Sequence, residues 1–155
     1  MSSLDGDLYP KEFGCYLAHP NAKMPTKANM NDAGFDLSSI ECVNLSPGER
    51  KLVGSGVHLQ LSPGWEVQVR PRSGNAAKLG LTIVNTPGTI DADYTGEIKV
   101  ILLNTSKEVV YLSEGAKIAQ LVFQRVPKIV LKQLTEMPTN EARGEKGFGS
   151  SDKKQ

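Results

Sequence analysis

Residues 88–97, GTIDADYTGE, hold the residue types best suited to chemistry in this sequence. Asp91, Asp93 and Glu97 supply three carboxylates, and Tyr94 supplies a ring, in a segment bounded by glycines. A carboxylate can accept a proton from an attacking water, a ring can support a sugar, and glycine lets backbone approach a ligand closely. A β-protein does not need this combination in order to fold. We therefore expect function to lie in this loop.

Two further segments carry polar groups at apparent turns. Asp32 and Asp36 flank a Gly-aromatic pair, which fits either an Asx-turn that opens a strand or a functional carboxylate pair. Residues 71–74, PRSG, place an arginine, a hydroxyl and glycine backbone at the end of an apolar run. Such a turn is a phosphate site, with a following helix N-terminus as a further donor, or an ordinary polar turn.

Two other features concern a strand and the tail. Gln120 interrupts the apolar run 115–123, and a buried amide must find hydrogen-bond partners, either in the core or on a ligand. Residues 143–151 are too rich in glycine for a helix or strand. They nevertheless hold Arg143, which could grip a phosphate, and Phe148, which could stack on a base. A disordered tail is the alternative interpretation.

The elements that must position these groups are strands. Apolar and polar residues alternate along 57–62 and 65–70, and β-branched apolar runs occupy 98–103, 109–112 and 118–126. Ser-Pro-Gly or Thr-Pro-Gly at 46–48, 62–64 and 86–88 predicts type II turns. Short strands at this spacing predict an all-β sandwich or barrel, with one short helix at 75–79.

Length and composition limit the class of protein. At 155 residues the chain predicts one domain, residues 1–136, followed by a flexible glycine-rich arm, 137–155. A net charge of +1 argues against a nucleic-acid or membrane-surface partner. Cys15 and Cys42 have no metal-binding spacing and are interpreted as buried thiols in a reducing compartment. We expect an intracellular, cytoplasmic protein, and nuclear, organellar or viral settings stay open.

Taken in order, five segments resemble the five motifs of the trimeric deoxyuridine triphosphatase (dUTP diphosphatase) family. They are AGFDLSS at 33–39, PRSGNAAKLGL at 71–81, NTPGTIDADYTGE at 85–97, GAKIAQLVF at 115–123 and RGEKGFGSS at 143–151. The resemblance implies a β jelly roll, also described as a distorted β-barrel, and a homotrimer with shared active sites. It implies Mg²⁺-assisted hydrolysis of dUTP to dUMP and pyrophosphate by water attack on the α-phosphorus. That reaction keeps uracil out of DNA and supplies dUMP for thymidylate synthesis.

The resemblance also assigns catalytic roles. Asp91 aligns with the general base, Gln120 fits as a donor to phosphate or to the catalytic water, and Asp36 lies near the metal-bound phosphates. Asp93 and Glu97 either support the loop or reach the metal through water. Mg²⁺ prefers phosphate oxygens and water, so we expect no direct protein ligand set.

Substrate contacts follow in the same way. The phosphates meet the 71–74 loop, the uracil edge is read by Asn85 and the backbone of 88–90, and Tyr94 lies against the deoxyribose and rejects UTP. The resemblance implies that the tail closes over an active site, which we expect to be that of a neighbouring subunit. The predicted substrate-binding residues are Arg72, Ser73, Gly74, Asn85, Gly88, Thr89, Ile90, Tyr94, Lys99, Arg143, Phe148, Gly149 and Ser150.

Three positions depart from the common family pattern: Asn75, Thr95 and Lys146. Two rival interpretations come from other classes of protein. One is a dCTP deaminase-like relative on the same fold, including bifunctional forms, against which the tyrosine-bearing third motif argues. The other is a non-catalytic nucleotide-sensing module, against which the intact Asp91, Arg143 and Phe148 argue.

Overall fold

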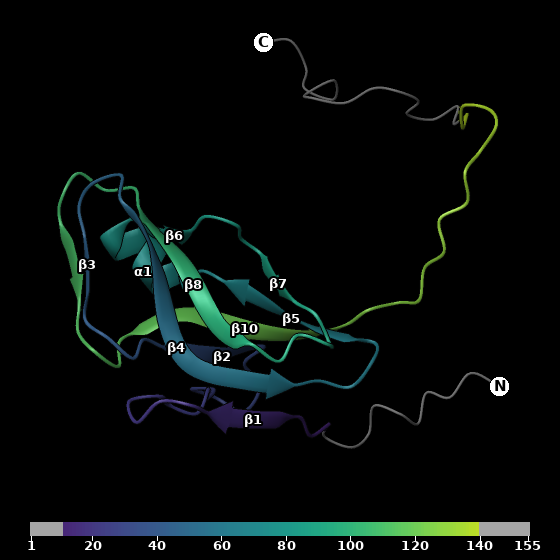
Figure 1. The fold of residues 1–155 in the computed structure, drawn as a ribbon. Helices are drawn as coiled ribbons and strands as arrows, with labels where there is room; N and C mark the ends of the chain where they lie inside the picture. The colour runs from purple at the N-terminus through teal and green to yellow at the C-terminus, as the bar shows by residue number, and fades with distance from the viewer. Residues whose placement is uncertain (1–10, 140–155) are drawn as a thin grey trace, which may run out of the picture.

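The fold is known from a computed structural model that describes residues 11–139 (Figure 1). Within these residues the chain forms ten strands and one helix. In chain order they are β1 (Gly14–Leu17), β2 (Gly34–Ser38), β3 (Val43–Leu45), β4 (Arg50–Gln60), β5 (Trp65–Arg70), α1 (Ser73–Leu79), β6 (Leu81–Ile83), β7 (Gly88–Ile90), β8 (Glu97–Asn104), β9 (Val110–Leu112) and β10 (Lys117–Arg125). The predicted strands are confirmed, and β4 begins earlier than the alternation at 57–62 indicated.

The strands form two four-stranded sheets and a small third sheet. Their orders are β1-β4-β8-β6, β2-β10-β5-β7 and β3-β9, and the pairings are antiparallel. Consecutive strands β6, β7 and β8 alternate between the two larger sheets, so the chain crosses from one layer to the other twice over residues 81–97. The result is a jelly-roll sandwich, and the part of the chain described here does not close into a barrel.

One apolar core lies between the two sheets because each strand turns alternate residues inward. In β8, Ile98, Val100 and Leu102 are buried while Lys99 is exposed. Val53 from the same sheet and Leu121 from the opposite sheet belong to the same buried cluster. Each such side chain contributes about 1.5–3 kcal/mol when it leaves water.

The expected short helix is present but begins at Ser73, two residues before the predicted start at 75. It ends at Leu79 and is capped by Gly80, whose φ of 65° is left-handed and whose N–H donates to the Ala76 carbonyl at 3.2 Å. A glycine accepts this conformation without steric cost, so the helix stops here and β6 begins. Helix α1 thus directly continues the predicted phosphate loop.

The three predicted Pro-Gly turns do not all form. Gly48 and Gly64 adopt φ of 75° and 83°, as a type II turn requires. The peptide bond before Pro87 is instead cis, and Gly88 belongs to strand β7 without a left-handed φ. The type II prediction was wrong at this third position, because Gly88 pairs with Val69 of β5.

The expectation of two buried thiols was also only partly right. Cys15 is half-buried, and burial raises the pKa of its thiol. Cys42 is exposed, because it lies in the short connection just before β3. No helix within residues 11–139 has the length and apolar character needed to cross a membrane.

Asn104, at the end of β8, is a fully buried polar side chain that fastens the small sheet to the sandwich. Its amide donates to the carbonyls of Leu45 and Glu108 at 3.0 and 2.8 Å, and its oxygen accepts the N–H of Ser106 at 2.9 Å. Removing it leaves buried backbone groups without partners.

We therefore expect Asn104→Ala to lower the free energy of unfolding by about 2–4 kcal/mol, measured by urea denaturation. Asn44→Ala, at an exposed position of β3, is the matched control and should change it by less than about 0.5 kcal/mol. Equal effects from the two variants would contradict a fastening role for Asn104.

Candidate active site

The predicted phosphate loop follows β5 and is held from the neighbouring strand. In the sheet, Gln120 of β10 lies opposite Arg70 on one side and Asp36 on the other. Its amide Nε2 donates to the carbonyl of Pro71 at 2.8 Å. A Cβ at Gly34 would collide with the Gln120 amide oxygen, so glycine there makes room for this side chain. In this structure Gln120 therefore fixes the start of the loop.

Asp36 is the electrostatic centre of this half of the site. Its Oδ1 accepts from Arg72 Nε at 2.8 Å, and its Oδ2 lies 2.6 Å from Lys117 Nζ. Burial raises the pKa of Asp36, but hydrogen bonds from Lys117 and Arg72 and their charges outweigh that effect and hold the pKa below its ordinary value of 3.8. Both carboxylate oxygens are thus engaged by cations.

These groups line a polar cavity of about 340 Å³. Its chemistry is that of an anion site, because a guanidinium, a hydroxyl and loop backbone meet in one place. The lining residues are Ala28, Asp32, Ala33, Gly34, Asp36, Arg72, Ser73, Gly74 and Gln120. The structure therefore brings together the residues predicted from the first, second and fourth motifs.

Sequence reasoning did not single out Lys117, and it noted Asn75 only as a departure from the family pattern. The Asn75 amide donates to the Lys117 carbonyl at 2.9 Å and so ties α1 to β10. The register of β10 against β2 shifts between Lys117 and Ala119. Such a bulge changes which face later residues occupy, so simple alternation could not place Lys117 beside Asp36.

The second half of the site is the loop around β7, an edge strand of its sheet. Residues 88–90 pair with β5 on one side, which leaves the backbone of the other side without a neighbouring strand in the described part of the chain. Gly88 is buried, and a Cβ there would lie 3.3 Å from the amide nitrogen of Asn85. This edge can therefore offer backbone hydrogen bonds to a flat ligand.

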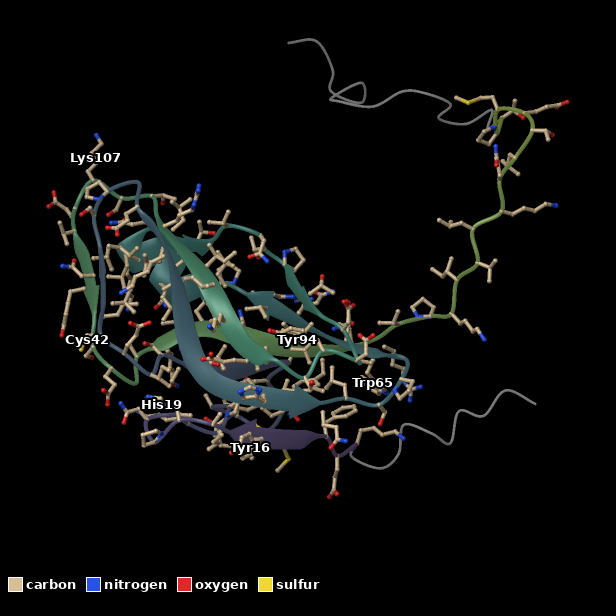
Figure 2. All side chains as sticks on the ribbon, viewed as in Figure 1. Tyr16, His19, Cys42, Trp65, Tyr94 and Lys107 are labelled. Atoms are coloured by element: carbon tan, nitrogen blue, oxygen red, sulfur yellow. The ribbon has the colours of Figure 1, made fainter. Side chains whose placement is uncertain are left out.

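The aspartate carboxylates that follow β7 have no hydrogen-bond partner in the described part of the chain, whereas the ring of Tyr94 is held by its hydroxyl. Asp91 and Asp93 are exposed, and within residues 11–139 no hydrogen bond or ion pair engages either carboxylate. Tyr94 is 44% exposed and donates its hydroxyl to the Glu97 carbonyl at 2.8 Å (Figure 2). The ring therefore presents its surface while its hydroxyl is held within the loop.

Ile90, Tyr94, Glu97 and Lys99 line a second cavity of about 410 Å³, together with Leu52 of β4. It shares no lining residue with the polar cavity around Arg72. Lys99 lies 3.5 Å from Glu97 and remains about half exposed, so it can reach a ligand in this cavity. In this chain the two halves of the predicted site thus line separate cavities.

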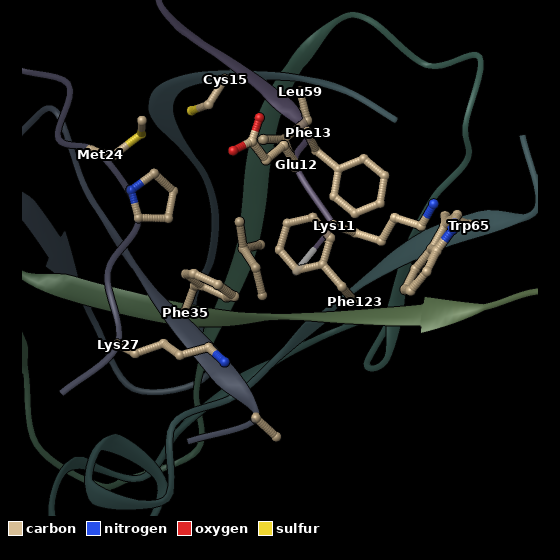
Figure 3. Close-up of a pocket in the computed structure, with 13 residues that line it drawn as sticks. Lys11, Glu12, Phe13, Cys15, Met24, Lys27, Phe35, Leu59, Trp65 and Phe123 are labelled. Atoms are coloured by element: carbon tan, nitrogen blue, oxygen red, sulfur yellow. The ribbon is translucent and has the colours of Figure 1, made fainter. Parts of the chain in front are cut away.

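A third cavity, of about 590 Å³, is of another kind (Figure 3). Aromatic rings surround it: Phe13 stacks on Phe123 at 5.5 Å between centroids, and Trp65 and Phe35 meet these two rings edge-on. Ala33 is the one lining residue that this cavity shares with the polar cavity. The larger cavity is apolar and is not where the predicted site residues gather.

The predictions for the tail and for a metal ion are not tested by these contacts. Arg143, Lys146, Phe148, Gly149 and Ser150 lie outside the described residues. Within residues 11–139, no three His, Cys, Asp or Glu side chains gather in a position to hold a metal ion. Both carboxylate oxygens of Asp36 are engaged by cations, so in this arrangement the group leaves no open position for a metal ion.

Fold and site together define a class. The chain is an all-β jelly-roll protein with an arginine-bearing loop suited to a phosphorylated ligand and with an exposed carboxylate beside a separate, ring-bearing cavity. The dUTPase family profile matches residues 20–152. The deoxyuridine 5'-triphosphate nucleotidohydrolase of Clostridium kluyveri is 47% identical over 130 residues, which cover 84% of this chain and 90% of that protein. The chain belongs to the dUTPase family.

Solved structures agree. A mutant dUTPase of Staphylococcus bacteriophage 80alpha, with dUpNHpp, matches with a TM-score of 0.83 at 28% identity and covers 92% of this chain and 99% of its own. A mutant dUTPase from phage phi11 of S. aureus, described with a structural Mg(II) ion, matches with a TM-score of 0.76 at 27% identity, covering 83% of this chain and all of its own.

The Asp36 ion pairs yield a test of stability against pH. Because the pKa of Asp36 is lowered in the folded protein, its contribution is complete above its ordinary value of 3.8 and is lost as the pH falls through the lowered pKa. We expect Asp36→Asn to lower the free energy of unfolding by about 1–3 kcal/mol at pH 7. The difference in the free energy of unfolding between Asp36→Asn and the unmodified protein should narrow below pH 3.8.

Urea denaturation at constant protein concentration over a pH series measures this gap. Glu114→Gln, at an exposed position, is the control and should leave the pH dependence of the free energy of unfolding unchanged. A gap that stays constant down to the lowest accessible pH would contradict the role of the Asp36 charge.

Proposed function

We propose that this protein hydrolyses dUTP to dUMP and pyrophosphate by attack of water on the α-phosphorus. One observation carries the proposal: of the carboxylates that the motifs single out, Asp36 and Glu97 are engaged by cations or N–H groups, whereas Asp91 and Asp93 are exposed and unengaged within residues 11–139. A general base must be available to a water molecule. Asp91 takes that role, directly after the edge strand that meets the nucleoside.

The phosphate chain binds at the 71–74 loop. Arg72 and Ser73 supply a guanidinium and a hydroxyl, and Gln120 and Asp36 hold that loop in place through Pro71 and Arg72. A rigid donor set costs little reorganisation as charge develops on the phosphoryl oxygens. Arg143 would add a clamp on the γ-phosphate. Mg²⁺, when bound on the nucleotide, neutralises phosphate charge and orients the triphosphate.

The nucleoside is recognised around β7. The free edge of β7 at Gly88, Thr89 and Ile90, with the amide of Asn85, reads the uracil edge, and cytosine would leave buried donors facing each other. The ring of Tyr94 lies against the deoxyribose and leaves no room for a 2′-hydroxyl. Phe148 would stack on the base, with Gly149 and Ser150 beside it in the closing tail. Removal of dUTP keeps uracil out of DNA and provides dUMP inside the cell.

A homotrimer with shared sites is part of the proposal. The two half-sites occupy separate cavities of one protomer, and a neighbouring copy can bring the missing half to each. Beyond β10 the chain leaves the sandwich (Figure 1). Val130 and Leu131 are 86% and 94% exposed, which is costly unless another copy covers them.

The rival dCTP deaminase-like activity and the non-catalytic module are not favoured by the family membership. Incubation of the protein and Mg²⁺ with dUTP, dCTP, UTP or dTTP, followed by separation of the products, tests all three. Formation of dUMP and pyrophosphate from dUTP alone supports the proposal. Ammonia release from dCTP, or dUTP binding without product, contradicts it.

The role of Asp91 can be tested by substitution. Asp91→Asn keeps the size of the side chain but cannot accept a proton, so kcat should fall by about 10²–10⁴-fold while the Kd for a non-hydrolysable dUTP analogue changes little. Asp93→Asn, two residues along the same exposed loop, is the matched comparison. If Asp91→Asn retained full turnover, another group would have to be the base.

Shared sites can be tested by complementation. Asp91→Asn and Arg72→Ala should each be inactive alone, yet each mixed trimer made by co-expression should regain activity at one of its three sites, which is about one quarter of all sites in a random mixture of the two chains. Those sites combine an intact Asp91 from one subunit with an intact Arg72 from another. Absence of any recovery in verified mixed trimers would show that one subunit supplies both residues.

A further inference from the structure

The pairing of β4 with β8 is interrupted where the nucleoside loop joins β8. Gly54 lies opposite Lys99 and His58 lies opposite Glu97, so the register shifts between these two pairs. Gly56, inside the interruption, has a left-handed φ of 64°. The two strands run side by side in Figure 1, and this bulge is the point at which their regular ladder fails.

The N–H groups freed by the bulge are taken up by side chains. Glu97 Oε1 accepts the N–H of Ser55 at 3.1 Å and that of Gly56 at 2.9 Å. The Ser55 hydroxyl donates to the Ile98 carbonyl at 2.5 Å and accepts the N–H of Val57 at 3.2 Å. Residues 54–58, here called the β4 bulge, are thus closed by the carboxylate of Glu97 and the hydroxyl of Ser55.

Glu97 also holds the ring of Tyr94, which lines the nucleoside cavity. The backbone carbonyl of Glu97 accepts the Tyr94 hydroxyl at 2.8 Å, and a Cβ at Gly96 would lie 2.6 Å from Cζ of that ring. The carbonyl of Thr95 lies 2.9 Å from His58 Nδ1, which ties the loop to the far side of the bulge. Loop and bulge therefore form one connected unit that ends in the exposed face of Tyr94.

We infer that Glu97 is a positioning residue, which sets the orientation of the Tyr94 ring by locking the loop onto the β4 bulge and thereby controls discrimination between dUTP and UTP. The inference rests on the proposed function, since it assigns the sugar-selecting ring to that reaction. It also decides between the two roles left open for Glu97 in favour of loop support.

A metal-linked role fits the contacts less well. One carboxylate oxygen of Glu97 is occupied by two backbone donors, and the other lies 3.5 Å from Lys99 Nζ. The Glu97 side chain is only 24% exposed. A group held in this way has little freedom to coordinate the hydration shell of an ion on the phosphates.

The test compares Glu97→Gln with Glu97→Ala. Glutamine keeps an oxygen that can accept both N–H groups and loses only the long contact to Lys99, so kcat/KM for dUTP should stay within about threefold. Alanine removes the lock, so kcat/KM should fall by about 10–50-fold and the preference for dUTP over UTP by about tenfold. The Mg²⁺ concentration for half-maximal rate should not change in either variant.

The exposed ion-pairing carboxylate Glu41 provides the control variant Glu41→Gln, which should match the unmodified protein. Loss of activity in Glu97→Gln equal to that in Glu97→Ala, or a raised Mg²⁺ requirement, would overturn the inference. So would an unchanged dUTP preference in Glu97→Ala. An unmodified protein that does not hydrolyse dUTP would instead refute the proposed function.

If Glu97→Ala does not fold, Tyr94→Phe still tests the same lock. It keeps the ring and Glu97 but removes the hydroxyl that bonds the Glu97 carbonyl. The dUTP preference should then fall while urea denaturation shows a stability close to that of the unmodified protein. An unchanged preference in this variant would also overturn the inference.

Discussion

Buried backbone N–H groups must find partners, and the site of this protein is built where the sheets fail to provide them. The ladder of β4 with β8 breaks at residues 54–58, and that of β10 with β2 shifts at 117–119. At the first break Glu97 accepts the freed N–H groups, and next to the second Lys117 turns toward Asp36. These two irregularities therefore let charged side chains enter a sandwich whose interior is otherwise packed with apolar side chains.

This arrangement divides the carboxylates into two kinds. Asp36 and Glu97 are held by donors and cations, and the pKa of each lies below its ordinary value because those contacts outweigh the effect of burial. They remain charged and act as fixed supports. Asp91 follows an edge strand in an exposed loop and is unengaged within residues 11–139. The surroundings, and not the residue type, thus distinguish a support from a group free to do chemistry.

Much of the fold could be predicted from the sequence, because period-2 alternation and Pro-Gly dipeptides are local signals of strands and turns. The strands at 65–70 and 98–103 and the turns at Gly48 and Gly64 follow from them. Features that depend on tertiary pairing could not be predicted in this way. The pairing of Gly88 with Val69 displaced a type II turn.

The candidate site could also be predicted only in part from the sequence. Its motif residues were readable from type and spacing, whereas the partners that hold them were not. The bulge at Lys117 reverses the facing that alternation indicates, and nothing in the order of residues connects Glu97 with Ser55 and Gly56, about forty positions earlier. Long-range hydrogen bonds of this kind arise only once register is set, so they become visible only in the folded chain.

Separation of the two half-sites has a consequence for how selectivity and chemistry relate. The ring of Tyr94 belongs to a unit anchored on β4 through Glu97, and the edge of β7 is paired with β5, while Arg72 is anchored on β2 and β10 through Asp36 and Gln120. Each unit is rigid by itself, because its polar groups are satisfied internally. In the proposed trimer, a ligand that spans the phosphate loop of one copy and the nucleoside cavity of another meets a geometry set by how the copies pack. In such a design, nucleoside recognition and phosphate binding are tuned by different networks of hydrogen bonds, and the interface between copies brings them into register.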